Sequence, residues 1–246
     1  MNNRIIALGL VAGLVSGLVS FAYVRLRVSP LVDLAIGQEE GGAHPHAPAA
    51  EHELFSRAVQ ENVGAGVGTV MFAIVLGALL SVAVSALLIY LNRRGIVVDP
   101  RWPAGGLAAV GFLAVNLVPF LAFPANPPGV GAAETISPRT SAYLVILVVS
   151  VALAIGATIL AVRLSPRVGG WTAIGLAFGC YLPAVTVVAL TLPRFDEMPA
   201  HFPAGLLADF RLNSILTQAI MWLTLGVVFA AWLPRALTTR TVDAHS

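Results

Sequence analysis

Apolar and polar residues follow one another along this chain in long blocks. Six blocks are almost entirely apolar, and each has about the 20 residues that a helix needs to cross the hydrocarbon core of a bilayer. Short strands of alternating polar and apolar residues do not occur, so the pattern does not indicate a transmembrane barrel. It predicts an all-α, polytopic integral membrane protein with six transmembrane helices in a single membrane domain, residues 1–246. The predicted spans are residues 5–24, 64–91, 104–123, 142–162, 171–192 and 215–233.

The first apolar block has two interpretations. Arg4, followed by an apolar stretch that ends in small residues, resembles a cleavable signal peptide, and cleavage would leave five spans. The block is longer than a usual signal core, however, and it carries Gly9, Gly13 and Gly17 at a four-residue spacing that suits close helix packing. We therefore expect a retained helix whose glycine face packs inside the bundle or against a partner helix.

Composition agrees with a membrane protein and disfavours an enzyme. Hydrophobic residues make up 58% of the chain and charged residues only 11%, about half the charged fraction of a soluble domain. All 14 basic residues are Arg, which excludes a Walker A lysine and a Lys Schiff base. No HExxH, GxSxG or Gly-rich phosphate loop occurs, and Cys180 is the single cysteine. We expect neither enzymatic activity nor nucleic-acid binding.

Acidic residues and histidines lie almost entirely on alternate polar segments. The segments at about 25–62, 124–141 and 193–214 hold ten of the 12 acidic residues and four of the five histidines. The other segments include two short connections that are dense in Arg. Because the positive-inside rule counts short loops most heavily, we expect both termini in the cytoplasm and the acidic segments outside. The predicted location is the cytoplasmic (inner) membrane, with several spans.

The first outside segment carries potential metal ligands. Its middle, residues 37–50, is rich in Gly, Ala, Pro and His, and we expect it to be flexible. Neutral imidazole and carboxylate suit zinc, cobalt and nickel, and soft thiolates are missing. We predict capture of a divalent cation; a solvated acidic linker is the alternative. The candidate ligands are His44, His46, Glu51, His52 and Glu53, with His201 and Asp209 of the last outside segment.

Four further polar residues lie near the predicted outer surface: Glu61, Asn62, Asn126 and Asn213. Together they would form an oxygen-rich vestibule that leads to a passage between helices. Capping of helix ends explains each of them equally well. Because no Asp, Glu, Lys, Arg or His lies clearly within a predicted span, the sequence indicates no intramembrane carboxylate relay.

Several stretches are similar to one known membrane family. They are LFSRAVQENVGAGVG at 54–68, FPANPPGVG at Phe123–Gly131 and FPAGLLADFRLNSILTQAIMW at Phe202–Trp222. With the small-residue first span and the His- and Glu-bearing loop, they resemble the predicted cobalt transporter subunit family CbtA over residues 4–235. The resemblance implies uptake of a divalent transition metal, cobalt above all, for cobalamin supply. It also implies a small one-span, His-rich partner subunit similar to CbtB.

No permanently bound cofactor is expected; Co²⁺, or Ni²⁺ or Zn²⁺, is expected as the transported ion. Two other functions fit the membrane pattern without metal transport. One is a non-transporting scaffold subunit that organises another chain, and the other is a permease for a small uncharged solute. The two are distinguished from metal uptake by whether the protein binds cobalt.

Overall fold

The computed structural model describes residues 3–42, 63–195 and 202–238. Helices make up 88% of these described residues, and none of them forms a strand. Six helices are long and apolar enough to cross a membrane. The all-α fold class and the six membrane-spanning helices predicted from the apolar blocks are confirmed.

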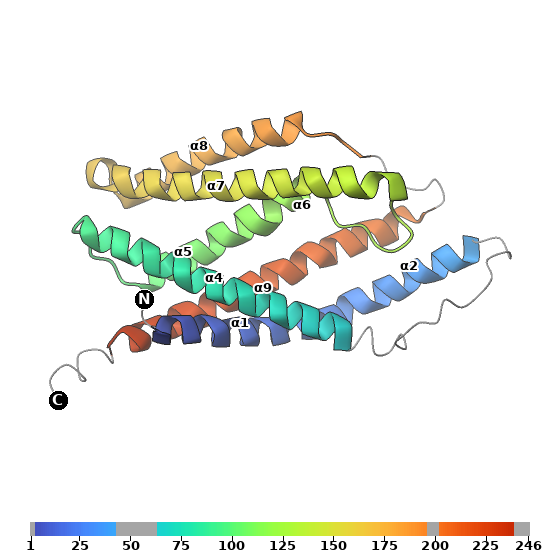
Figure 1. The fold of residues 1–246 in the computed structure, drawn as a ribbon, viewed down its shortest axis with the longest axis horizontal. Helices are drawn as coiled ribbons and strands as arrows, with labels where there is room; N and C mark the ends of the chain where they lie inside the picture. Colours follow the sequence, from blue (N-terminus) through green and yellow to red (C-terminus); the bar gives the residue numbers. More distant parts are fainter. Residues whose placement is uncertain (1–2, 43–62, 196–201, 239–246) are drawn as a thin grey trace. The chain divides into compact units, whose positions relative to one another are not determined.

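The helical elements follow the chain in the order shown in Figure 1. They are α1 (Asn3–Tyr23), the π-helical turn η1 (Val24–Val28), α2 (Ser29–Gly42), α4 (Ala65–Arg93), α5 (Arg101–Gly111), the π-helical turn η3 (Phe112–Leu117), α6 (Val118–Ala122), the 3-10 turn η4 (Ala133–Thr135), α7 (Ile136–Val168), α8 (Gly170–Thr191) and α9 (Ala204–Thr238).

Two of the helices extend well beyond the predicted spans. The chain continues from α1 through η1 into α2, so residues 25–42 are helical although the hydropathy pattern places them in an outside segment. Helix α9 begins at Ala204, whereas its predicted span begins at 215. Charged residues lower the hydropathy at both places, but Arg and Glu are good helix formers, so the helix does not end where the apolar block ends. We expected residues 37–50 to be flexible. Residues 37–42 form the last turns of α2, and residues 43–50 lie outside the described residues.

The helices form two compact units. The first, Met1–Ala109 with Pro127–Gly129 and Pro203–Ser246, contains α1, α2, α4, most of α5 and α9, and is called the α1–α9 unit. The second, Val110–Asn126 with Val130–Phe202, contains α6, α7 and α8, and is called the α7–α8 unit.

The glycine face of α1 packs against α4. A Cβ added at Gly13 would lie 2.5 Å from the carbonyl oxygen of Ala73, and one added at Gly17 would lie 2.7 Å from Cα of Val70. Gly77 of α4 lies directly against Gly9, so two glycines meet at the closest point. The backbones approach this closely because neither helix carries a side chain there. The face that we expected to pack inside the bundle or against a partner helix is therefore covered by α4 of the same chain.

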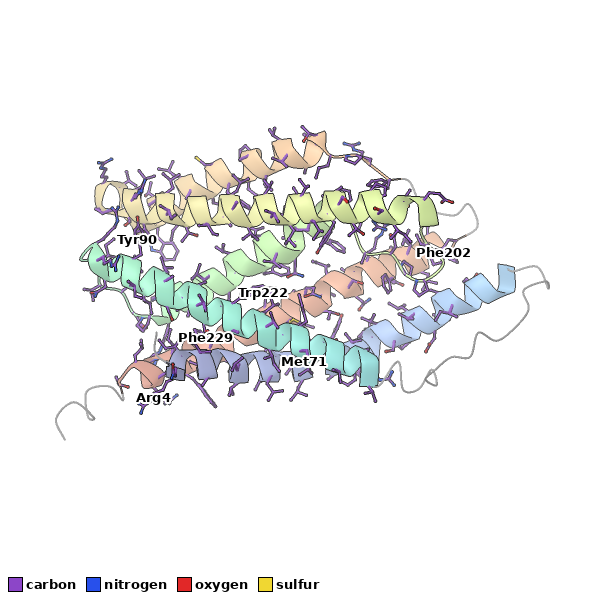
Figure 2. All side chains as sticks on the ribbon, in the orientation of Figure 1. Arg4, Met71, Tyr90, Phe202, Trp222 and Phe229 are labelled. Atoms are coloured by element: carbon purple, nitrogen blue, oxygen red, sulfur yellow. The ribbon has the colours of Figure 1, made fainter. Side chains whose placement is uncertain are left out.

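Helix α1 also lies against α9, so it contacts a neighbour on each of two faces. Trp222 and Phe229 of α9 are buried inside this unit (Figure 2). The outward faces are apolar instead: Met71 is 55% exposed and Leu223 is 69% exposed. An apolar exterior around a core that also holds polar side chains is what a helix bundle surrounded by lipid requires.

In the α7–α8 unit, two long helices run side by side and are joined by Gly169 alone. This glycine has φ +84°, a left-handed conformation that side chains disfavour, and it lets the chain turn from α7 into α8 within one residue. Between the helices, the hydroxyls of Ser150 and Tyr181 lie 2.7 Å apart in a hydrogen bond. Ile146 and Val185 are buried around this bond.

Candidate functional site

Most of the residues predicted to form the site lie outside the described part of the chain. This group contains the predicted ligands His44, His46, Glu51, His52, Glu53 and His201, and the vestibule residues Glu61 and Asn62. Their roles stay predictions. Asp209, Asn126 and Asn213 are described.

Asp209 is the one predicted metal ligand that lies within the described ranges. It is exposed and lies within the first two turns of α9. Among the described residues, no three His, Cys, Asp or Glu side chains come close enough together to hold a metal ion. A site in which three His, Cys, Asp or Glu side chains including Asp209 hold a metal ion therefore needs ligands from outside the described residues.

Asn126 belongs to the stretch that follows α6, and a nearby arginine holds that stretch in place. The Nη2 of Arg139, in the first turn of α7, donates a hydrogen bond of 2.6 Å to the carbonyl oxygen of Pro124. The rings of Phe123 and Phe195 lie 6.1 Å apart between centroids and make an aromatic contact. Asn126 itself is half-buried. Nothing in the sequence indicates that Arg139 has this carbonyl partner.

Asn213 is buried at the contact between α1 and α9. The hydroxyl of Tyr23 donates a hydrogen bond of 2.8 Å to Oδ1 of Asn213, and Nδ2 of Asn213 donates one of 2.8 Å to the carbonyl oxygen of Asp209. Both polar groups of its amide therefore have a protein partner. Because α9 begins at Ala204, Asn213 lies inside the helix and the alternative of helix-end capping does not apply to it. Its predicted place in a vestibule stays a prediction.

A second polar contact joins the same two helices. The hydroxyl of Ser16 donates a hydrogen bond of 2.6 Å to the carbonyl oxygen of Met221. Ser16 and Ser20 on α1 are fully buried, and Thr217 on α9 is 7% exposed. We call Ser16, Ser20, Tyr23, Asn213 and Thr217 the polar seam. The seam consists of neutral oxygen and amide groups along the facing sides of α1 and α9.

Sequence reasoning missed the polar seam because its serines lie inside an apolar block. A signal was present: residues 16, 20 and 23 recur at helical spacing, as do residues 213 and 217, so each set lies on one helix face. Among the described residues, the buried polar side chains are serines, Asn213 and Thr217, and no Asp, Glu, Arg or His is among them. The seam therefore offers hydrogen bonds and oxygen ligands without fixed charge.

Comparison with known proteins identifies the family. A family model described as "probable cobalt transporter subunit (CbtA)" matches residues 2–234, which is nearly the whole chain. No curated protein and no solved structure matches the chain. The match covers all six membrane-spanning helices nearly to the end of α9, and confirms the resemblance that the sequence stretches indicate. The chain belongs to the CbtA family of probable cobalt transporter subunits.

Proposed function

We propose that this protein carries a divalent transition metal, cobalt above all, across the cytoplasmic membrane into the cell for cobalamin supply. The observation that carries the proposal is the family match over residues 2–234, because that family is one of cobalt transporter subunits. The six long apolar helices support it, since a transporter must span the bilayer. Co²⁺ is the cargo in this proposal, Ni²⁺ and Zn²⁺ are competing ions, and no permanently bound cofactor takes part.

The segment between α2 and α4 is proposed to collect the ion. Its ligand set of His44, His46 and His52 with Glu51 and Glu53 combines imidazole nitrogen and carboxylate oxygen, which suits cobalt, nickel and zinc. Asp209 is exposed on α9 of the α1–α9 unit, and α2 lies against α9 in that unit. The ligand-bearing segment therefore follows α2, and α2 contacts α9, the helix that carries Asp209. His201 is proposed to join the same ligand set from the chain just before α9.

The proposed orientation places both termini in the cytoplasm. An even number of spans puts the two ends on the same side, and the short Arg-rich connections favour that side as the inner one. The ligand-bearing segments then face outward, where the ion arrives. Glu61, Asn62, Asn126 and Asn213 are proposed to provide neutral and acidic oxygens near the start of its path.

We further propose that the chain acts with a small His-rich, one-span subunit similar to CbtB and has no enzymatic activity of its own. The family is one of transporter subunits, which supports both parts of this proposal. Cobalt uptake that needs a second chain would agree with it.

The capture role is tested by changing His44, His46 and His52 together to Ala. We expect the cobalt concentration that gives half-maximal uptake to rise about tenfold or more, because each lost imidazole removes about a kcal/mol or more of ligation and 1.4 kcal/mol is tenfold. His245→Ala is the matched control, since this histidine lies in the carboxyl-terminal tail. Unchanged concentration dependence in the triple variant, with normal protein levels in the membrane, would rule out capture by these histidines.

A further inference from the structure

Ser20 is a fully buried hydroxyl with no hydrogen-bond partner. Its side chain is 0% exposed, and its Oγ contacts no donor or acceptor within hydrogen-bond distance. Serines inside helices usually bond to a carbonyl of their own preceding turn, as Ser85 does to Ser81 at 2.7 Å. A buried polar group without a partner is costly, and the bilayer offers no water to satisfy it. An unsatisfied hydroxyl at the centre of a helix contact therefore calls for a partner other than the protein, either a water or a ligand.

The position of Ser20 follows from the two hydrogen bonds of the polar seam. Ser16 bonds to Met221 and Tyr23 bonds to Asn213, so α1 and α9 are antiparallel and their register is fixed. Ser20 lies between these two bonds, at the level of Thr217. The next residue of α9, Gln218, carries a second buried oxygen without a partner, Oε1. Two unsatisfied oxygens thus occur at one level of the α1–α9 unit, with Gln218 about 100° further round α9 than Thr217.

Ser20 also lies close to α4. On the surface of α1, its direction falls between that of Ser16, which contacts α9, and that of Gly17, which contacts α4. Ser20 therefore lies on the side of α1 where all three helices meet. All three helices belong to the α1–α9 unit.

Apart from the O–H of Ser20 itself, the hydrogen-bonding groups that stay free at this level are acceptors. The hydroxyl of Ser16 already donates to Met221, and that of Thr217 donates at 2.8 Å to the carbonyl oxygen of Asn213. Their remaining lone pairs, with Oε1 of Gln218, accept only. A group of acceptors calls for a positive ligand. All are neutral oxygens, which are hard ligands; the absence of carboxylate disfavours a divalent ion, and the absence of imidazole and thiolate disfavours a transition metal.

We propose that Ser20, together with Ser16, Thr217 and Gln218, binds a monovalent hard cation of the Na⁺ class at the junction of α1, α4 and α9. Membrane transporters also coordinate Na⁺ with neutral oxygens, there from unwound backbone carbonyls of interrupted helices; here the oxygens are hydroxyl and amide groups of the continuous helices α1 and α9. This site is separate from the proposed cobalt ligands, and it holds no His, Asp or Glu. The inference goes beyond the proposed function, because cation binding here requires no cobalt.

Thermal unfolding of the purified full-length protein in detergent tests the proposal. The melting temperature is followed by tryptophan fluorescence, to which the buried Trp222 beside the seam contributes, in NaCl, LiCl, KCl or choline chloride at constant ionic strength. We expect a saturable rise of several degrees in Na⁺ relative to choline. In Ser20→Ala the Na⁺ concentration for half the rise should increase at least tenfold, whereas Ser85→Ala, which removes a serine bonded to its own helix, should keep the wild-type response.

A second variant tests the site in case Ser20→Ala does not fold. Thr217→Val keeps the side-chain shape and removes one of the oxygens, and it should also weaken the Na⁺ response. In choline, Ser20→Ala should melt no lower than the wild type, because it removes a hydroxyl that has no partner. Equal melting temperatures in all four salts would show that at most a water occupies the junction, and would overturn the proposal. A Na⁺ response that both variants retain would overturn it as well.

Discussion

The hydroxyl of Tyr23 donates a hydrogen bond of 2.8 Å to Oδ1 of Asn213, across 190 positions of sequence. It joins the end of α1 to the early turns of α9. The bond from Ser16 to Met221 joins the same helices further along, so α1 cannot slide along α9 without breaking both. Inside a membrane, where burial of apolar surface does not hold helices together, such bonds and close packing determine the register.

Removal of the Tyr23 hydroxyl should weaken the contact between α1 and α9. We expect Tyr23→Phe to lower the free energy of unfolding in detergent by about 0.6–1.7 kcal/mol, the range for hydrogen bonds between membrane helices. The same substitution in an Asn213→Ala background should have a much smaller effect, because the partner is already gone. Chemical unfolding of the four proteins measures the coupling. Equal losses in both backgrounds would show that this bond does not stabilise the unit.

A methyl group on the glycine face of α1 should force α1 and α4 apart. A Cβ at Gly13 would lie 2.7 Å from Cα of Ile74, and backbone atoms cannot move aside as a flexible side chain can. We expect Gly13→Ala to cost about 1–3 kcal/mol, as overpacking does in other cores. Gly68→Ala on α4 is the control, because nothing lies within 4 Å of its added Cβ. The melting temperature should fall in Gly13→Ala and stay unchanged in Gly68→Ala. A fall in both variants, or in neither, would contradict the close packing of α1 against α4.

Arg139 should hold the Phe123–Gly131 stretch in its observed conformation. Its guanidinium donates to the carbonyl oxygen of Pro124 at 2.6 Å, and hydrogen bonds from charged groups contribute about 1.5–3 kcal/mol. In Arg139→Gln we expect amide hydrogen exchange across this stretch to become about tenfold faster or more. Arg167→Gln, near the other end of α7, should leave the stretch unchanged. Identical exchange in both variants would mean that the stretch is held by other contacts.

The hydrogen bond between Ser150 and Tyr181 should act in the same way in the α7–α8 unit. Tyr181→Phe is expected to lower the free energy of unfolding by about 0.6 kcal/mol, up to about 1.7 kcal/mol. Thr158→Val is a suitable comparison, because Thr158 bonds to Ala154 of its own helix and not to a neighbour. If Thr158→Val destabilises as much as Tyr181→Phe, the interhelical bond has no special role.

The number and order of the membrane-spanning helices could be predicted because apolar blocks of bilayer length are a strong signal. Helix ends could not: hydropathy falls at Arg25 and Arg27, yet the backbone stays helical to Gly42. Charged residues indicate where a membrane span leaves the hydrocarbon core, whereas capping and packing determine where the helix itself ends. Ala35, fully buried in α2, shows that packing continues beyond the apolar block.

The sequence predicted candidate ligands, and most of these lie outside the described residues; it could not predict which described residues contact one another. The glycine spacing in the first block indicated close packing, but the sequence did not show that α4 would be the neighbour. Asn213 was singled out as polar, yet its partner Tyr23 lies in a block read as apolar, and pairing across 190 positions leaves no local pattern. The helical spacing of residues 16, 20 and 23 could place Ser20 on one helix face, but not show that its hydroxyl lacks a partner, because that depends on the residues around it.

Radioactive cobalt accumulation in cells that express this chain, with and without a small His-rich partner subunit, tests the central claim most directly. The account predicts accumulation above the empty-vector control when both chains are present, with competition by excess nickel or zinc. It also predicts weaker uptake at low cobalt concentration when His44, His46 and His52 are Ala. No accumulation in either condition, with the protein present in the membrane, would contradict transport and favour a scaffold role for the six-helix chain.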